Sequence, residues 1–309
     1  MSPAASGLPV AVTGWSVHLP GVDAAAEVGL PGTGPACAAD DARLWLGRKG
    51  LLFKEPATRL ALCAVHRALG LPPAAARTGS APARAGSGAG RADGGVDPRT
   101  AVVASSNLGN VATVVDVVRT VRAEGGRAVS PLAAPNASSN VIASTVALWF
   151  GWGGPNLMVC SGATSGLDAI ALAGLLLAAR RADRVVVVGA EPDDEVASAV
   201  HGRRLAYDDG PPLRAAAACV ILRRPDDVGG GAATLGPVMV GGAVGPHEDA
   251  GPLARLRDLG DTYGAAGVVL VALAAGLLDA GLAAGPVPVA CGDPVDGWRH
   301  MSVRVGDRR

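Results

Sequence analysis

The chain has 309 residues, and its 27 basic and 27 acidic residues leave no net charge at neutral pH. Such a chain has no overall field to attract nucleic acid or an anionic membrane surface, so we expect neither as a partner. Hydrophobic residues make up 49% of the chain and aromatic residues only 3%, which predicts a large core of small aliphatic side chains. The length favours either two domains or one duplicated α/β unit.

Signals for export, membrane insertion and metal binding are missing from the sequence. The N-terminus has no basic start followed by an apolar run, and the apolar segments are interrupted before they could span a bilayer, so we expect a cytoplasmic protein. The five cysteines and five histidines lack the close spacing of a zinc site or a redox motif. We therefore expect reduced thiols and no metal site.

The first half of the chain alternates strand and helix patterns. Short β-branched runs predict strands at residues 10–14 and 100–105, and apolar positions at helical spacing predict helices at 55–69, 111–123 and 141–149. Residues 74–97 consist mostly of Ala, Gly, Arg, Ser and Pro. So few large apolar groups cannot repay the entropy of ordering, and this segment is predicted to be a mobile loop.

The same alternation continues towards the C-terminus. The patterns predict strands at residues 155–160, 184–189, 216–222, 238–244 and 301–305, with helices at 166–179 and 264–278. Strands that alternate with helices indicate a parallel or mixed sheet covered on both faces. The predicted fold class is therefore α/β.

Five segments in order carry a resemblance to a known family. Residues 155–170, PNLMVCSGATSGLDAI, followed by ADRVVVVGAE at 182–191, resemble the nucleophile region of β-ketoacyl synthases of the thiolase fold. The other four matches are Thr13–Gly14 with Pro20–Gly21, Ser130–Pro131 with Pro135–Asn136, RLAYD at 204–208 and TYGAAG at 262–267. The resemblance implies a thiolase-like layered fold, α/β/α/β/α.

The resemblance also implies a division of the chain. Residues 1–225 correspond to a ketosynthase-like N-terminal half that carries the nucleophile region, and residues 226–309 to a C-terminal half. A long segment present in the family is missing between Pro225 and Gly260. We therefore expect the second half of the duplicated fold to be truncated.

The family's catalytic residues are replaced in this sequence. In the family, a cysteine thiolate at the N-terminus of a buried helix takes the acyl chain as a thioester, and two histidines assist decarboxylation of the malonyl unit. Alignment of residues 165–170 with the family motif places Ala163 at the cysteine and Asp261 at the second histidine. The loop that carries the first histidine has no counterpart. Because a methyl group cannot carry an acyl chain, no catalytic residue is assigned.

Several polar side chains near Ala163 leave an alternative open. Cys160 could be a displaced nucleophile, but on a strand it would lie away from the helix N-terminus that activates a thiol, so a structural thiol is favoured. The hydroxyls of the turn need a neighbouring base to attack, so helix capping is favoured for them. These hydroxyls belong to Ser161, Thr164 and Ser165. Asp168 and Glu191 could form a catalytic carboxylate pair, but separate structural roles are favoured for them.

The predicted helix at 111–123 has an apolar face made by Val111, Val114 and Val118. One interpretation is core packing. The other follows from the resemblance, which is strongest to chain-length factors of type II polyketide synthases. In these proteins the corresponding helix lines the tunnel that holds the growing chain, so the three valines are candidate tunnel residues.

The resemblance implies a non-catalytic subunit that forms a heterodimer with an active ketosynthase and shapes the acyl tunnel for decarboxylative condensation of a polyketide or a polyene-like chain. Acyl carrier protein would deliver phosphopantetheine, and no cofactor of its own is expected. The interface is predicted on the strand before the nucleophile turn, at Asn156, Leu157, Met158, Val159 and Cys160. Two alternatives stay open: an acyltransferase or malonyl decarboxylase of altered chemistry, and a purely structural scaffold.

Overall fold

The computed structural model describes residues 9–74, 96–204, 210–241 and 251–306. The expected mobile loop at 74–97 lies almost wholly outside the described residues, as does the end of the strand expected at 238–244. No helix in the described part of the chain is long and apolar enough to cross a bilayer.

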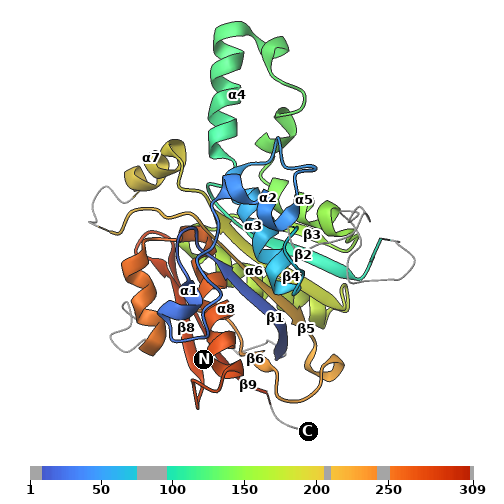
Figure 1. Ribbon diagram of the computed structural model, residues 1–309, viewed down its shortest axis with the longest axis vertical. Helices are drawn as coiled ribbons and strands as arrows, with labels where there is room; N and C mark the ends of the chain where they lie inside the picture. The colour runs from blue at the N-terminus through green and yellow to red at the C-terminus, as the bar shows by residue number, and fades with distance from the viewer. Residues whose placement is uncertain (1–8, 75–95, 205–209, 242–250, 307–309) are drawn as a thin grey trace.

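The described strands form one mixed sheet in the order β3-β2-β4-β5-β1-β6-β9-β7, with β8 paired to β9 (Figure 1). The first five are β1 (Val10–His18), β2 (Thr100–Ser105), β3 (Asn156–Val159), β4 (Arg184–Glu191) and β5 (Ala216–Arg223). β2 is parallel to β3 and β4, whereas β5 is antiparallel to β4 and β1. The α/β class with a mixed sheet is thus confirmed.

The later strands repeat part of this arrangement. They are β6 (Ala233–Leu235), β7 (Met239–Val240), β8 (Val287–Asp293) and β9 (Gly297–Val305). β6 pairs antiparallel with β1 and β9, and β8 also pairs antiparallel with β9. The antiparallel set β8-β9-β6 therefore mirrors β4-β5-β1, which indicates a duplicated unit with a shorter second copy.

Helices cover both faces of the first part of the sheet. α3 (Pro56–Ala68) and α5 (Val141–Phe150) lie on one face, and α6 (Ser165–Ala178) and α8 (Ala266–Asp279) on the other. The other described α-helices are α1 (Ala24–Glu27), α2 (Arg43–Leu46), α4 (Val111–Glu124) and α7 (Glu195–Arg204). Side chains of β4 point alternately to the two faces: Val186 and Val188 join the core cluster of α3 and α5, whereas Val185 and Val187 join that of α6 and α8.

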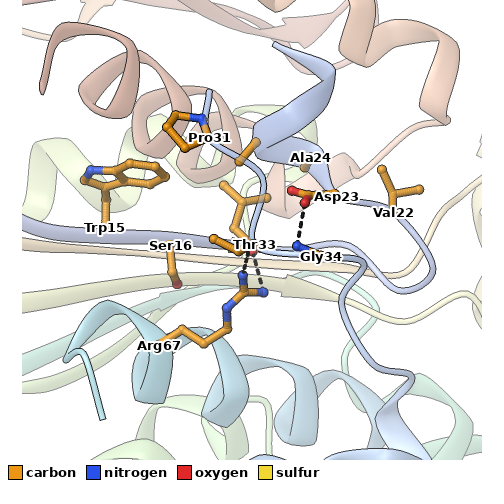
Figure 2. A pocket seen from close by; sticks show the side chains of 11 residues that line it. Trp15, Ser16, Val22, Asp23, Ala24, Pro31, Thr33, Gly34 and Arg67 are labelled. Atoms are coloured by element: carbon orange, nitrogen blue, oxygen red, sulfur yellow. Dashed lines mark hydrogen bonds between the residues drawn. The ribbon is translucent and has the colours of Figure 1, made fainter. Parts of the chain in front are cut away.

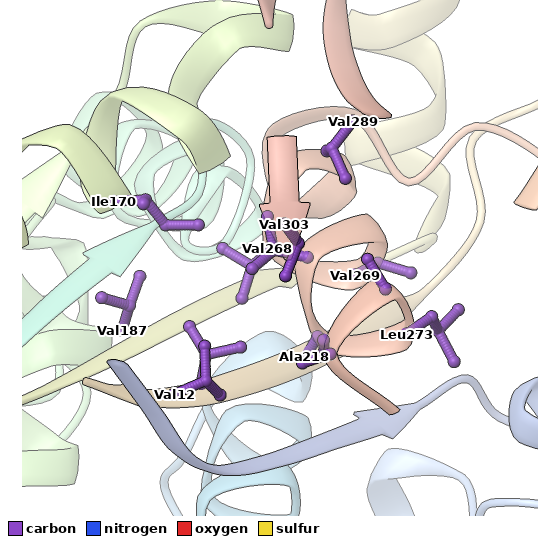
Figure 3. Close-up of a cluster of buried hydrophobic side chains, with 14 of the residues drawn as sticks. Val12, Ile170, Val187, Ala218, Val268, Val269, Leu273, Val289 and Val303 are labelled. Atoms are coloured by element: carbon purple, nitrogen blue, oxygen red, sulfur yellow. The ribbon is translucent and has the colours of Figure 1, made fainter. Parts of the chain in front are cut away.

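The cluster of α6 and α8 also contains side chains from the second strand set. Val268 and Leu273 of α8 lie in one core with Val187 of β4, Val289 of β8 and Val303 of β9 (Figure 3). The sheet thus curls so that α8 lies between its two parts, which gives four layers of the expected α/β/α/β/α arrangement, in keeping with a truncated second half. The predicted boundary at residue 225 falls in the 3-10 turn Pro225–Asp227 between β5 and β6. The division into two domains stays a prediction, because the two parts share one sheet.

Close approach of α6 and α8 depends on two glycines. A Cβ added at Gly267 would lie 2.6 Å from the backbone nitrogen of Leu167, and one added at Gly166 would lie 2.8 Å from Cα of Gly267. No real Cβ tolerates such distances to backbone atoms. The Gly-rich motif at residues 264–267 therefore serves helix packing, and it fixes the N-terminus of α6 against that of α8.

The structure adds elements that the sequence patterns did not predict, namely the short helices α1 and α2, helix α7 and strands β6 and β8. The helix expected at 264–278 begins at Ala266, after the 3-10 turn η8 (Tyr263–Ala265). The strand expected at 301–305 begins earlier, at Gly297.

Candidate functional site

The site develops around the turn between β3 and α6. The 3-10 turn η5 (Gly162–Thr164) directly precedes α6 and carries Ala163, which is 8% exposed. Gly162 adopts a φ of 70°, a conformation in the left-handed region that favours glycine. The turn thus places Ala163 at the N-terminus of a largely buried helix.

An internal carboxylate occupies this helix N-terminus. The backbone N–H of Ala163 donates to Oδ2 of Asp296, at 2.7 Å. Asp296 lies in the turn between β8 and β9, and it pairs with Arg204 of α7. A second carboxylate, Asp293, forms an ion pair with the same guanidinium at 2.6 Å. Although burial opposes ionisation, the hydrogen bond from Arg204 holds the pKa of Asp293 below its usual value.

This arrangement has a direct chemical consequence. A helix N-terminus with free N–H groups is an anion-binding site, and it stabilises a thiolate or an oxyanion where one is present. Here the chain's own Asp296 accepts the Ala163 N–H, and Arg204 neutralises the carboxylate. The position that a reacting carbonyl oxygen would need is therefore filled from within.

The loop after β2 holds the turn from the other side. The side-chain amide of Asn107 donates to the carbonyl of Gly162 and accepts from its N–H, both at 2.9 Å. Glu191, at the end of β4, is fully buried and accepts from the hydroxyl of Ser106 at 3.0 Å and from the N–H groups of Asn107 and Leu108 at 2.7 and 3.0 Å. Burial raises the pKa of Glu191 to about 7, against the effect of these hydrogen bonds.

Asp168, on the first turn of α6, has a different set of partners. It accepts from the hydroxyls of Ser161 and Thr164 at 2.6 and 2.7 Å, and it pairs with Arg299 at 2.7 Å. Because Asp168 is already paired with Arg299, its bonds to these two hydroxyls are assigned to holding the start of α6 and not to activating a nucleophile. The geometry favours separate structural roles for Asp168 and Glu191 over a catalytic carboxylate pair.

Asp261 contacts a histidine that is distant from it in the sequence. Its Oδ2 contacts Nε2 of His201 at 2.8 Å, and its Oδ1 accepts the N–H of Tyr263 at 2.7 Å. His201 lies on α7, is 3% exposed and packs edge-on against the ring of Tyr263. The guanidinium of Arg204 lies over the ring of Tyr263, 4.7 Å from its centroid. No sequence pattern indicated this pair, because α7 was not predicted.

Small apolar side chains fill the remaining space above the turn. One buried cluster combines them: Leu108, Ala163, Ala197, Leu213 and Tyr263, with Val111 packed against it. No other valine of the proposed tunnel face joins this cluster. Val114 and Val118 are 39% and 42% exposed on α4, which projects from the body of the molecule and buries none of its residues (Figure 1). Packing into the chain's own core is therefore wrong for these two valines.

The remaining residues singled out from the sequence lie on or just after the edge strand. β3 stands first in the sheet order and pairs only with β2 among the described strands. Cys160 follows it at an exposed position. Desolvation of the sulfur and the charge of Glu191 raise the pKa of the Cys160 thiol, so this cysteine lacks the thiolate character of a nucleophile.

Solved structures share this fold along nearly the whole chain. The ishigamide ketosynthase/chain length factor superposes with a TM-score of 0.69 at 20% identity, covering 97% of this chain and 100% of that chain. A type II polyketide synthase acyl-carrier protein in complex with its ketosynthase bound to the hexaketide gives 0.65 at 12% identity, covering 96% and 99%. The ketosynthase from module 6 of the bacillaene synthase from Bacillus subtilis 168 gives 0.54 at 11% identity, covering 97% and 72%.

These similarities define the thiolase-like fold of ketosynthases. In sequence, the N-terminal domain of β-ketoacyl synthases matches residues 39–211, more than half of the chain. The chain therefore belongs to the β-ketoacyl synthase family. No curated protein matches the sequence. The matched region contains Ala163 but ends before Asp261 and Asp296.

Proposed function

We propose that this chain is a non-catalytic, chain-length-factor-like subunit that pairs with an active ketosynthase and shapes the tunnel for the growing acyl chain. The observation that carries the proposal is the state of the nucleophile turn. Alanine stands at the acceptor position, and the N–H that would stabilise a reacting oxygen is bonded to Asp296.

The open edge of β3 supports a paired assembly. Pro155 and Val159 direct their carbonyls to β2, because they accept hydrogen bonds from Val102 and Ser106. Alternation along a strand then points the backbone groups of Asn156 and Met158 outwards. A strand edge of this kind is a template for another strand. In the proposed heterodimer, β3 pairs antiparallel with the equivalent strand of the ketosynthase.

Exposed apolar side chains flank this edge. α5 and α6 pack against β3 from its two sides, and they expose Leu148 at 81% and Leu175 at 61%. On α4, Val114, Val118 and Val121 form an exposed apolar stripe at helical spacing. Surface of this kind is expected to be covered in the assembled protein. The valine stripe is the surface that we assign to the tunnel shared with the partner.

Acyl carrier protein is the expected wider partner, because the substrate chain and its phosphopantetheine arm arrive on it. One of the structural relatives named above, an acyl-carrier protein in complex with its ketosynthase, supports this assignment. The proposed reaction of the complex is decarboxylative condensation of a polyketide or polyene-like chain, with its chemistry on the partner.

The proposal is tested by condensation assays with acyl and malonyl carrier-protein thioesters. The chain alone is expected to give no condensation product and no covalent acyl adduct by mass spectrometry, and to support product formation when co-expressed with a partner ketosynthase that has an intact catalytic cysteine. Ala163→Cys alone should stay inactive, because Asp296 and Arg204 still fill the site. An acyl adduct on Cys160 or a serine of the wild-type chain would instead favour an acyltransferase of altered chemistry.

The interface is tested by Met158→Pro, which removes an outward N–H and leaves the pairing with β2 intact. The chain should fold, as judged by circular dichroism, yet fail to co-purify with the ketosynthase. Leu157→Pro is the matched control, because this residue faces β2 and its substitution should disrupt the fold itself. Co-purification of Met158→Pro at the wild-type yield would place the interface elsewhere.

The tunnel assignment is tested by product length in the reconstituted pair. Val114→Phe or Val118→Phe should shorten the product, because the larger ring fills space at the exposed face of α4. Asp116→Phe adds the same ring on another exposed face and should leave product length unchanged. Unaltered length in both valine variants of an intact complex would favour a purely structural scaffold.

A further inference from the structure

Three reactive side chains that the sequence keeps apart come together on the far side of the sheet from α6. His18 ends β1, Cys37 lies in the loop that follows α1, and Cys63 lies in α3. Their sulfur and ring nitrogen atoms all lie within 4.8 Å of one another. His18 and Cys63 are fully buried, whereas Cys37 is partly exposed. None of the three takes part in the site around Ala163.

The hydrogen bonds decide between a metal site and a thiol pair. Nη1 of Arg67 lies 3.4 Å from Nδ1 of His18. A guanidinium can only donate, so Nδ1 is the acceptor and the ring proton resides on Nε2. Nε2 donates that proton to the carbonyl of Cys37 at 2.9 Å. The imidazole therefore has no free lone pair for a metal ion, and the two sulfur atoms are left as the reactive groups.

The surroundings make one sulfur a thiolate and keep the other protonated. A hydrogen bond from Cys63 lowers the pKa of Cys37 to about 5, helped by His18, against the opposing effects of burial and of Asp41. The same hydrogen bond and burial raise the pKa of Cys63 far above its usual value. A thiolate that accepts from a neighbouring thiol is the arrangement of a reactive dithiol.

Cys37 is partly exposed, and a pocket of about 150 Å³ is lined by Thr33 and Gly34, which precede it in the same loop, and by Arg67. Figure 2 shows Arg67 extending from α3 towards Thr33, to which it donates at 2.6 Å, and Gly34 bonded to Asp23. Residues 33 and 34 belong to the loop that leads to Cys37. A small oxidant can therefore approach this loop, whereas Cys63 is held within α3.

We propose that Cys37 and Cys63 are a redox-active dithiol that a hydroperoxide oxidises to an intramolecular disulfide. The Cys37 thiolate attacks a peroxide oxygen, which forms an S–O bond and breaks the O–O bond; the leaving oxygen takes a proton and departs as water or an alcohol. The sulfur of Cys63, losing its proton to the departing hydroxide, then displaces water from the sulfenic acid and forms the S–S bond. Two thiols are oxidised, one peroxide is reduced, and an external thiol reductant reverses the change.

The first test compares Cys37 with Cys160, the exposed cysteine, by iodoacetamide alkylation and peptide mass spectrometry. At pH 6 Cys37, whose pKa is lowered to about 5, is mostly thiolate, whereas Cys160, whose pKa is raised, is almost wholly protonated. The weaker intrinsic nucleophilicity of a less basic thiolate offsets only part of this advantage. Cys37 should therefore react about tenfold faster. Its rate should be flat from pH 6 to 8, whereas that of Cys160 should rise about tenfold per unit.

The groups that face Cys37 in this assay are His18, Cys63 and Asp41, with Arg67 behind His18. A Cys37 rate that climbs across the whole pH range would overturn the thiolate assignment. Cys63→Ser keeps a hydroxyl donor and should leave the flat profile in place.

The second test oxidises the reduced full chain with one equivalent of hydrogen peroxide. Two thiols should disappear, a peptide linking Cys37 to Cys63 should appear, and dithiothreitol should restore both thiols. In Cys63→Ser, oxidation should stop at a sulfenic acid on Cys37, trapped by dimedone. Oxidation of Cys160 ahead of Cys37, absence of the linked peptide, or one zinc bound per wild-type chain and lost in Cys63→Ser would each overturn the proposal.

Discussion

β4 and β8 occupy equivalent places in the two copies of the duplicated unit, and they differ in how much of them is covered. Seven of the eight residues of β4 are buried, because helices pack on both of its faces. β8 alternates, with Val287 and Val289 buried towards α8 and Pro288 exposed between them. The first copy is thus a complete layered unit, whereas the second retains mainly what encloses α8.

This difference shows which parts of the fold are retained in the shorter second copy. α8 is more deeply buried than α6, with eleven buried residues against seven, because strands of both copies pack against it. The second copy still supplies Asp296 and Arg299, which bind the first turns of η5 and α6. The retained strands therefore support the nucleophile turn of the first copy, even though the turn has no nucleophile.

The largest effect is expected where the two copies touch. Gly267→Ala would place a Cβ 2.6 Å from the backbone nitrogen of Leu167, and backbone cannot yield as a side chain can. We expect a loss of about 3 kcal/mol or more in the free energy of unfolding, measured by urea denaturation, or a failure to fold.

The matched control lies on α6. A Cβ added at Gly174 meets only Val10, at 3.7 Å, so Gly174→Ala should be stabilising by about 0.5–1 kcal/mol through helix propensity. Equal destabilisation by both substitutions would mean that the helix crossing is not the junction of the two copies.

The sequence predicted the first copy better than the second, for physical reasons. Residues 184–189 form a β-branched run between clear turns, and the predicted strand at 100–105 matches β2 at both ends. In the second copy, β6 has only three residues. In the first copy, the exception is α7, which has no sustained apolar face, since only Ala197 and His201 are buried. Tertiary pairing, and not local pattern, makes these segments regular.

The candidate site was also predicted only in part from the sequence. The motif alignment placed Ala163 at a helix N-terminus from sequence alone. Its partners could not be predicted, because Asp296 lies 133 residues away from Ala163 and His201 lies 60 residues from Asp261. Only folding brings such residues together. The partner and tunnel assignments remain predictions.

A second prediction concerns Glu191, which the first copy buries and the η8 turn of the second copy helps to enclose. Its folded-state pKa of about 7 exceeds the value of about 4.3 in an unfolded chain. Between these values the folded state binds more protons, so stability should fall as the pH rises from about 4.5 to 7. The expected fall is on the order of 3 kcal/mol.

The measurement is the free energy of unfolding at pH 5 and pH 7.5. Glu191→Gln cannot ionise, so its pH dependence should be flatter than that of the wild type over this window, although losing an acceptor oxygen lowers its stability at both values. Carboxyl groups with lowered pKa, such as Asp293, act only at more acidic pH. An identical slope in variant and wild type would contradict the assignment.

The smallest of the three effects is expected for the ion pair that links the two copies. Asp296→Ala removes the carboxylate that joins the second copy to Ala163 and Arg204. In the ion pair, the side chain of Asp296 is 21% exposed and that of Arg204 is 17% exposed. We expect a loss of about 1–2 kcal/mol, because the Ala163 N–H loses its acceptor while Asp293 still pairs with Arg204. Asp40→Ala is the control: its carboxylate is 91% exposed in the pair with Arg59, and such surface pairs contribute about 0–1 kcal/mol. Comparable losses in the two variants, by urea denaturation at pH 7, would show that the Asp296 contact is an ordinary surface pair and that the second copy does not hold the turn in place.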